Sequence, residues 1–180
     1  NQRSRELQAA GRTIYRFGLG QSPFPVPLSV VAALREHAAE KDYLPVEGLP
    51  ALREAVAGFH QRVDGVAFAP ENVLIGPGSK ELMFLLQLVV KADLLVPSPC
   101  WVSYGPQARI LDRRVVPILT HREERWRLTP QALDATCRDE PERARLLILN
   151  YPGNPDGDTY TAGELQAIAE VARRYNILVL

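Results

Sequence analysis

The residues with the clearest potential for chemistry follow an apolar run late in the chain. Residues 144–149 read ARLLIL and predict a buried strand, and residues 150–157 directly after it read NYPGNPDG. Because proline fixes φ and glycine permits left-handed backbone, this loop has few shapes and can hold Asn154 in one place. Ligands of open α/β sheets bind at the carboxyl ends of strands, where a fixed amide can donate to a ligand oxygen at any pH. An ordinary Pro/Gly connection is the alternative interpretation.

A second candidate lies in residues 75–81, which read IGPGSKE. A predicted strand enters a glycine-rich turn here, and a helix is expected to begin at about Ser79. The free N–H groups of a helix start, with the Ser79 hydroxyl and the Lys80 ammonium, can bind a phosphate. A tight turn with a serine cap is the alternative. The segment is not a nucleotide P-loop, because Ser79 replaces the glycine before the lysine and Glu81 replaces the magnesium-binding hydroxyl.

A third candidate lies in residues 96–104, which read VPSPCWVSY and follow another predicted strand. The indole of Trp101 can stack on a flat ring, although tryptophan also fills cores. A phosphate site, an aromatic surface and a fixed amide at the ends of different strands suit a phosphorylated, planar, heteroaromatic cofactor such as pyridoxal phosphate. A nicotinamide dinucleotide does not fit, because the Gly-x-Gly-x-x-Gly fingerprint with its downstream acid is missing.

The elements that must position these residues follow from apolar periodicity and helix-start signals. From residue 70 onward, strands and helices alternate, which predicts an α/β fold with a largely parallel sheet and helices on both faces. The predicted strands are 72–75, 93–96, 114–119, 144–149 and 177–180, and the helices between them are 79–90, 102–111, one from 129, and 161–175. Earlier in the chain we expect helices over 2–10, 28–40 and from about 50, and a short strand over 13–17.

Composition narrows the function classes. Lys+Arg and Asp+Glu both number 21, and this balance argues against a nucleic-acid or anionic-membrane partner. The only cysteines, Cys100 and Cys137, are far apart, and neither they nor the three histidines have metal-ligand spacing. We therefore expect a cytoplasmic protein with no metal site. No apolar run has membrane-spanning length. Because the chain starts without Met and ends in a predicted strand, we expect it to be a fragment.

The sequence resembles the class I/II aminotransferases, the fold-type-I pyridoxal-phosphate enzymes, over nearly its whole length and in the right order. Residues 154–157, NPDG, are similar to their Asn-Pro-Thr-Gly motif. Residues 43–53, YLPVEGLPALR, resemble their Tyr-x-x-x-x-Gly-x-x-x-Leu-Arg segment, and residues 99–104, PCWVSY, resemble their ring-stacking segment. Asp156 replaces the usual threonine, and we expect its carboxylate to make similar local turn bonds.

The resemblance implies a division into an N-terminal arm or small-domain segment, 1–40, and a cofactor-binding large domain, 41–180, incomplete at its C-terminal end. It implies that pyridoxal phosphate is held by residues with separate roles. Gly78, Ser79 and Lys80 would hold the phosphate, Trp101 would stack on the pyridine ring, and Asn154 would bond the phenolic oxygen.

The resemblance also implies two roles for residues early in the chain. Tyr43 would reach the phosphate bound in the partner subunit, which makes a homodimer the expected working unit. Gly20 would meet the substrate carboxylate through its backbone. The alternatives are a loop aromatic packed on its own helix for Tyr43 and a turn glycine for Gly20.

The implied activity is transfer of an amino group between an amino acid and a 2-oxo acid through a Schiff base. The Schiff-base lysine, the acid that pairs with the pyridine nitrogen and the arginine that binds the α-carboxylate all lie, in the family, beyond the point matching Leu180. We therefore expect no catalytic residue in these 180 residues, and no activity from them alone. Other fold-type-I reactions (lyase, decarboxylase, synthase) stay open, as does an aminotransferase-like sensor domain of a transcription regulator.

Overall fold

The computed structural model describes residues 2–15, 20 and 22–180, and the chain divides into two compact units, Asn1–Pro45 and Val46–Leu180. Within the described residues no helix is both long and apolar enough to cross a membrane. The predicted domain division after residue 40 stays a prediction.

Among its described residues the first unit contains the helices α1 (Gln2–Ala9) and α2 (Leu28–Glu36), where helices were predicted over 2–10 and 28–40. The strand predicted over 13–17 is wrong for Thr13, Ile14 and Tyr15, which form no strand; residues 16 and 17 lie outside the described part. A strand is stable only where a neighbour completes its backbone hydrogen bonds, and none is paired with these three residues.

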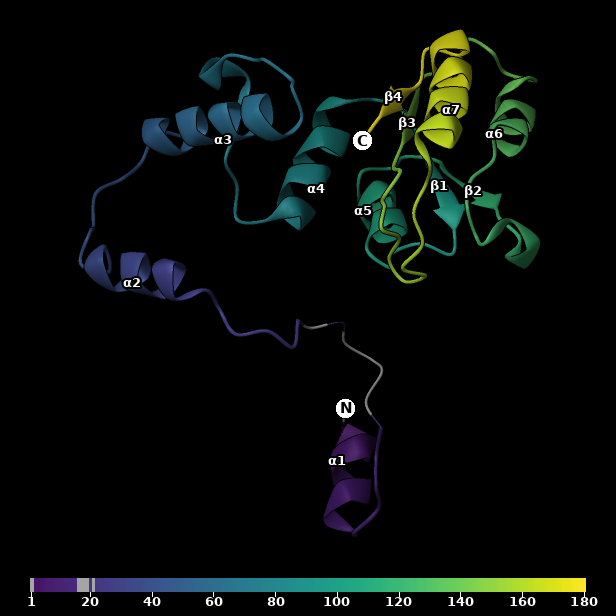
Figure 1. Cartoon of the computed structure of the whole chain (residues 1–180). Coiled ribbons are helices and arrows are strands. Elements are labelled where there is room, and N and C mark those ends of the chain that lie inside the picture. Colours follow the sequence, from purple (N-terminus) through teal and green to yellow (C-terminus); the bar gives the residue numbers. More distant parts are fainter. Residues whose placement is uncertain (1, 16–19, 21) are drawn as a thin grey trace. The chain divides into compact units, whose positions relative to one another are not determined.

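The second unit is an α/β fold (Figure 1). Its elements in chain order are α3 (Pro50–Val63), η1 (Pro70–Asn72), α4 (Ser79–Val89), β1 (Asp93–Ser98), α5 (Tyr104–Ile110), β2 (Val115–Leu119), η2 (Arg122–Glu124), α6 (Pro130–Cys137), β3 (Arg145–Leu147), α7 (Ala162–Arg174) and β4 (Leu178–Val179). Most predicted elements are present, with ends that differ by a few residues.

The strand predicted over 72–75 is wrong. Asn72 ends the 3-10 helix η1, and the extended stretch after it joins no sheet. Its polar backbone groups are bonded to residues well before it in the chain instead: Ile75 N donates to Glu47 O at 3.0 Å, and Arg53 Nε donates to Val73 O at 2.9 Å. An arginine side chain therefore holds the segment that leads to the glycine-rich turn.

The four strands form one parallel sheet in the order β2-β1-β3-β4. The connection from β1 leads to β2 on one side, whereas β3 lies on the other side of β1, so the strand order reverses between β1 and β3. Ligand sites of open parallel sheets lie in the crevice outside the carboxyl ends of the strands at such a reversal. The residues after Ser98 and Leu147 therefore lie where a ligand site is expected.

Two apolar cores cover opposite faces of the sheet. On one face, Leu94 and Leu146 pack with Tyr104 and Ala108 of α5 and with partly buried residues of α4. On the other face, alternate strand residues such as Leu147 pack with α6 and α7. Both faces are covered, as the alternation of strands and helices predicted.

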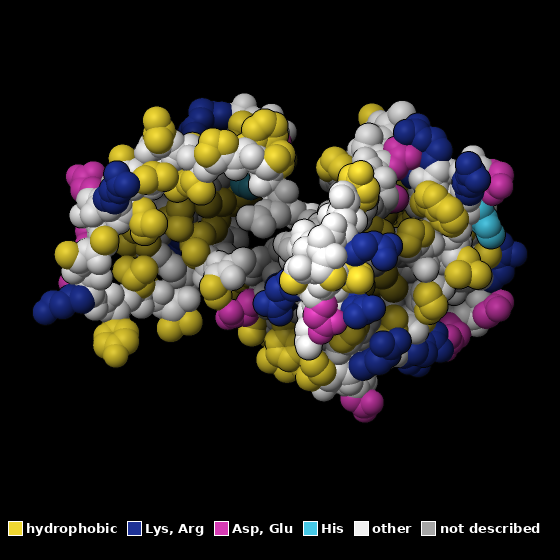
Figure 2. Space-filling model, turned by 90° about the horizontal axis from the view of Figure 1, so that it is seen from below, with side chains coloured by type: hydrophobic (Ala, Val, Ile, Leu, Met, Phe, Trp, Pro, Cys, Tyr) yellow, Lys and Arg dark blue, Asp and Glu magenta, His cyan; other side chains and the backbone are white. Residues whose placement is uncertain are grey.

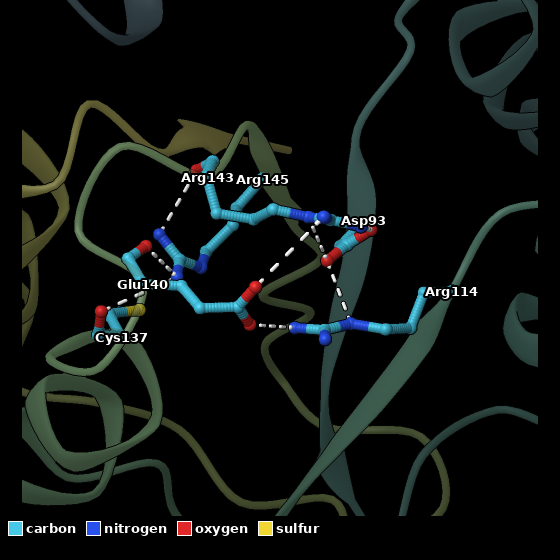
Figure 3. A network of polar contacts seen from close by, with 6 residues as sticks. All are labelled: Asp93, Arg114, Cys137, Glu140, Arg143 and Arg145. Atoms are coloured by element: carbon cyan, nitrogen blue, oxygen red, sulfur yellow. Dashed lines mark hydrogen bonds and ion pairs between the residues drawn. The ribbon is translucent and has the colours of Figure 1, made fainter.

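The sheet edge opposite those carboxyl ends carries a network of arginines and carboxylates (Figure 3). Asp93 is buried at the start of β1. Its carboxylate accepts hydrogen bonds from Nε and Nη2 of Arg143 at 2.9 and 3.0 Å, and it forms an ion pair with Nε of Arg114 at 2.8 Å. Arg114 also donates to Glu140 at 2.7 Å, and this hydrogen bond lowers the pKa of Glu140. The network ties β1 to the segments before β2 and β3.

Arg145 of β3, only 3% exposed, serves a different purpose in the same region. Its guanidinium donates to the backbone carbonyls of Cys137, Glu140 and Arg143, the first at 3.4 Å and the last at 3.0 Å (Figure 3). These carbonyls belong to the turn between α6 and β3, so one buried cation replaces the backbone donors that this turn lacks.

The start of α7 contains a capping box. The Thr161 hydroxyl accepts from Glu164 N, and the Glu164 carboxylate accepts from Thr161 N at 2.7 Å. We expect Thr161→Ala to lower the free energy of unfolding by about 1 kcal/mol, because the Glu164 N–H loses its acceptor and the Glu164 carboxylate loses the Thr161 hydroxyl. Urea denaturation would measure it, with Thr159→Ala as the matched control. Equal midpoints for the two variants would contradict the capping role.

Candidate functional site

A pocket of about 310 Å³ lies at the carboxyl ends of β1 and β3. It is lined by Ser79, Met83, Trp101, Tyr104, Ile148, Leu149, Asn150, Asn154 and Leu180. The pocket therefore brings together residues from all three segments that the sequence singled out. Tyr104 and Asn150 were not proposed as site residues, although both lie in those segments and are polar residues that follow a strand.

The start of α4 forms the first wall of the pocket. Gly78 has φ 104° and ψ 162°, a conformation that is essentially restricted to glycine. No side chain caps the helix that begins at Ser79, so its first N–H groups have no side-chain acceptor within the described structure. A helix start with free donors and partial positive charge favours an anion. Ser79 is thus a helix-start residue and not the side-chain cap of the alternative interpretation.

The segment after β1 forms the second wall. Trp101 is partly buried, and its ring meets the ring of the buried Tyr104 edge-on at 5.5 Å. Lys80 Nζ lies 5.0 Å from the centre of the Trp101 ring, so the cation of the first wall touches the aromatic surface of the second. Burial, and the neighbouring Cys100, raise the pKa of Tyr104 above its ordinary value.

The loop after β3 forms the third wall. Asn154 is exposed in a turn that is closed by two backbone hydrogen bonds, Gly153 N to Asp158 O at 2.7 Å and Gly157 N to Gly153 O at 2.8 Å. A Cβ added at Gly153 would collide with the Asp156 carboxylate. The turn bonds expected of that carboxylate are wrong: Asp156 makes no hydrogen bond with any described residue, and its side chain lies against Gly153 instead.

Residues 125 and 128 hold the C-terminal part of the loop. Arg125 donates to Asp158 at 2.6 Å, and Leu128 N donates to the Tyr160 hydroxyl at 2.8 Å. The Tyr160 ring packs against the core on the α6 and α7 face, and it meets Tyr151 edge-on at 5.7 Å. The loop that carries Asn154 is therefore anchored through Asp158 and Tyr160 on its C-terminal side.

Two predicted site residues belong to the other unit. Tyr43 is fully exposed and lies in an irregular segment after α2, and Gly20 is also exposed. Their predicted roles at the partner subunit's phosphate and at the substrate carboxylate stay predictions.

Cys100 lies beside the pocket and is partly buried. Burial raises the pKa of its thiol, so less thiolate is present at any pH between 7 and 9 than in a free cysteine. We expect alkylation of Cys100 at pH 8 to be at least about fivefold slower than in the urea-unfolded protein. Iodoacetamide labelling followed by mass spectrometry of the peptides would measure it. Rapid labelling that is already at its maximum below pH 7 would instead indicate an activated nucleophile.

Comparison with known proteins identifies the family. Residues 12–180 match the family of class I and II aminotransferases, and the chain belongs to this family. An aspartate/prephenate aminotransferase of Cereibacter sphaeroides is 32% identical over 178 residues, which cover 96% of this chain and 44% of that protein. An aspartate aminotransferase of Bacillus subtilis is 27% identical over 99% of this chain and 46% of its own length.

Solved structures give the same family. An aspartate aminotransferase from Rhizobium meliloti superposes with a TM-score of 0.88 at 27% identity, over 99% of this chain and 46% of its own. The aspartate aminotransferase from Thermus thermophilus with maleate superposes with a TM-score of 0.85 at 30% identity, over 99% and 47%. This chain thus spans about half the length of the relatives that it matches.

The enzymes of this family use pyridoxal phosphate, and the chemistry of the pocket fits that group. A glycine-only turn, an uncapped helix start, a hydroxyl and an ammonium suit its phosphate. An indole suits a flat ring, and an exposed amide on an anchored loop suits a ring oxygen. Among the described residues no cluster of metal-ligating side chains is found.

Proposed function

We propose that this chain supplies the cofactor-holding half of a pyridoxal-phosphate-dependent aminotransferase, which moves an amino group between an amino acid and a 2-oxo acid. The observation that carries the proposal is the pocket at the strand-order reversal, which Ser79, Trp101 and Asn154 line together and which Lys80 borders. Family membership supports the same cofactor.

Each residue has one task in this proposal. The backbone at Gly78, the Ser79 hydroxyl and the Lys80 ammonium bind the phosphate and so fix one end of the cofactor. Trp101 holds the ring plane. Asn154 donates to the phenolic oxygen and favours its charged form, because a donated hydrogen bond stabilises an anion.

Pyridoxal phosphate, when bound, supplies the electron sink that the amino-group transfer requires. In this proposal the pocket residues bind and orient the cofactor, and no covalent step is assigned to them. The same proposal includes a homodimer, in which Tyr43 completes the phosphate site of the partner subunit. It also includes a contact of Gly20 with the substrate carboxylate, and a cytoplasmic location. The face drawn in Figure 2 mixes basic, acidic and apolar side chains, as a protein with small-molecule substrates can do.

The test uses the protein as its gene encodes it. Pyridoxal phosphate is added, and a visible absorption band that borohydride abolishes is expected. Aspartate, after which several relatives are named, and 2-oxoglutarate are then supplied, and amino-group transfer is followed by product analysis. No visible band would overturn cofactor binding. Release of ammonia or carbon dioxide without transfer would keep the cofactor and overturn the aminotransferase assignment.

A further inference from the structure

Two buried glutamines join the walls of the pocket from behind. Gln87 of α4 is 2% exposed and Gln107 of α5 is 9% exposed, and Gln87 Nε2 donates to Gln107 Oε1 at 3.3 Å. Gln107 Nε2 in turn donates to the backbone carbonyl of Lys80 at 2.7 Å, and Gln87 Nε2 also donates to Met83 O at 3.1 Å. The result is a chain of amide hydrogen bonds that runs from α5 into the first two turns of α4.

The Lys80 carbonyl is a significant acceptor because of its position. It lies in the first turn of α4, directly after Gly78 and Ser79, and its second lone pair is free for a side chain when the helix uses the first. A bond to this oxygen therefore fixes the turn that forms the phosphate end of the pocket.

Gln107 is linked just as directly to the ring end of the pocket. It lies one turn after Tyr104 on α5, and Tyr104 holds the Trp101 ring edge-on. Tyr104 N also donates to Trp101 O at 3.3 Å. Gln107 thus sets the spacing between the phosphate end and the ring end, and a ligand whose phosphate and ring are joined covalently needs that spacing to be held within about 0.5 Å.

The amides are placed in otherwise apolar surroundings, since Met83, Leu86 and Ala108 pack in the same core. An apolar contact alone would fill the volume without selecting one register of α4 against α5, whereas a hydrogen-bonded pair selects one. The pair is also costly, because Gln87 Oε1 is buried without a partner in the described structure. Because the pair adds little to the stability of the fold, a role in positioning α4 against α5 explains it better.

We propose that Gln107, supported by Gln87, is a positioning residue that sets the phosphate-binding turn at Lys80 against the ring-binding segment at Trp101. This inference rests on the proposed cofactor function and adds residues that touch no ligand themselves.

The test compares pyridoxal phosphate with pyridoxal, which lacks the phosphate, in titrations of the protein as its gene encodes it. Gln107→Met keeps the shape and removes the donor. We expect it to weaken binding of pyridoxal phosphate about fivefold, the usual scale for one such hydrogen bond, and to leave the affinity for pyridoxal unchanged. Gln87→Met is expected to give a smaller change of the same kind, because Gln107 keeps its bond to Lys80. Gln166→Met, at an exposed position of α7, is the matched control.

The outcomes separate the two proposals. If the wild-type protein binds neither compound, the proposed function fails. If the wild-type protein prefers the phosphorylated compound and Gln107→Met keeps that preference in full, the positioning role is overturned, even where the melting temperature falls. If Gln107→Met weakens the binding of both compounds equally, the role of Gln107 is structural only, and the inference is again overturned.

Discussion

Replacing Gly78 by alanine is expected to weaken pyridoxal phosphate binding by about tenfold or more, an effect of about 1.4 kcal/mol. The residue has φ 104° and ψ 162°, where a Cβ costs about 1–3 kcal/mol. An alanine must either keep this conformation under strain or rotate the peptide that leads into Ser79. Strain lowers the free energy of unfolding, and rotation turns the first N–H groups of α4 away from the phosphate.

Cofactor titration and urea denaturation together distinguish the two responses. A rotated peptide lowers the affinity for the cofactor, whereas a strained alanine lowers the free energy of unfolding. Gly163→Ala is the matched control, because Gly163 lies in the first turn of α7 and an added Cβ there meets no atom within 4 Å. This control is expected to be neutral or stabilising by about 0.5 kcal/mol. A Gly78→Ala protein with wild-type affinity and wild-type stability would refute the glycine requirement.

Replacing Arg145 by methionine is expected to lower the free energy of unfolding by about 3 kcal/mol. Methionine fills much of the volume but donates no hydrogen bonds, so the carbonyls of Cys137, Glu140 and Arg143 lose the donors that Arg145 supplies. Because these carbonyls form the turn between α6 and β3, the loss falls on the centre of the sheet.

The matched control is Arg138→Met on α6. Arg138 is 60% exposed in its side chain and pairs with Asp134 at 2.9 Å, a surface ion pair worth at most about 0.5 kcal/mol. Urea denaturation of both variants measures how much free energy of unfolding each substitution removes. Equal losses would show that Arg145 acts as an ordinary surface cation, contrary to its burial.

Sequence patterns predicted the elements that have strong local signals. The apolar runs at 93–96 and 144–149 gave the central strands, and Thr129 and Thr161 gave helix starts, because side-chain caps are local chemistry. The predicted strands at 13–17 and 72–75 failed in their described residues, because a short extended run becomes a strand only when a neighbour pairs with it. Sequence alone contains no local signal for that pairing.

The candidate site shows the same division. Trp101 and Asn154 follow predicted strands that the sheet contains, and parallel topology brings strand ends to one edge, so their meeting was predictable. Ser79 follows a predicted strand that is absent, so the sheet pattern does not account for its place in the pocket. The contact between the glutamines behind the pocket was not predictable, because Gln87 and Gln107 are 20 residues apart and look like ordinary polar positions of two helices. Only the packing of α4 on α5 gives them a partner.

The two cores on opposite faces of the sheet have a consequence for how such a pocket can change. The walls at Ser79 and Trp101 belong to the α4 and α5 face, whereas the Asn154 loop is anchored through Tyr160 to the α6 and α7 face. Distant sites without shared partners contribute additively to free energy. Substitutions in the core of one face are therefore expected to alter the support of the walls on that face, and to leave the core that anchors the opposite wall unchanged.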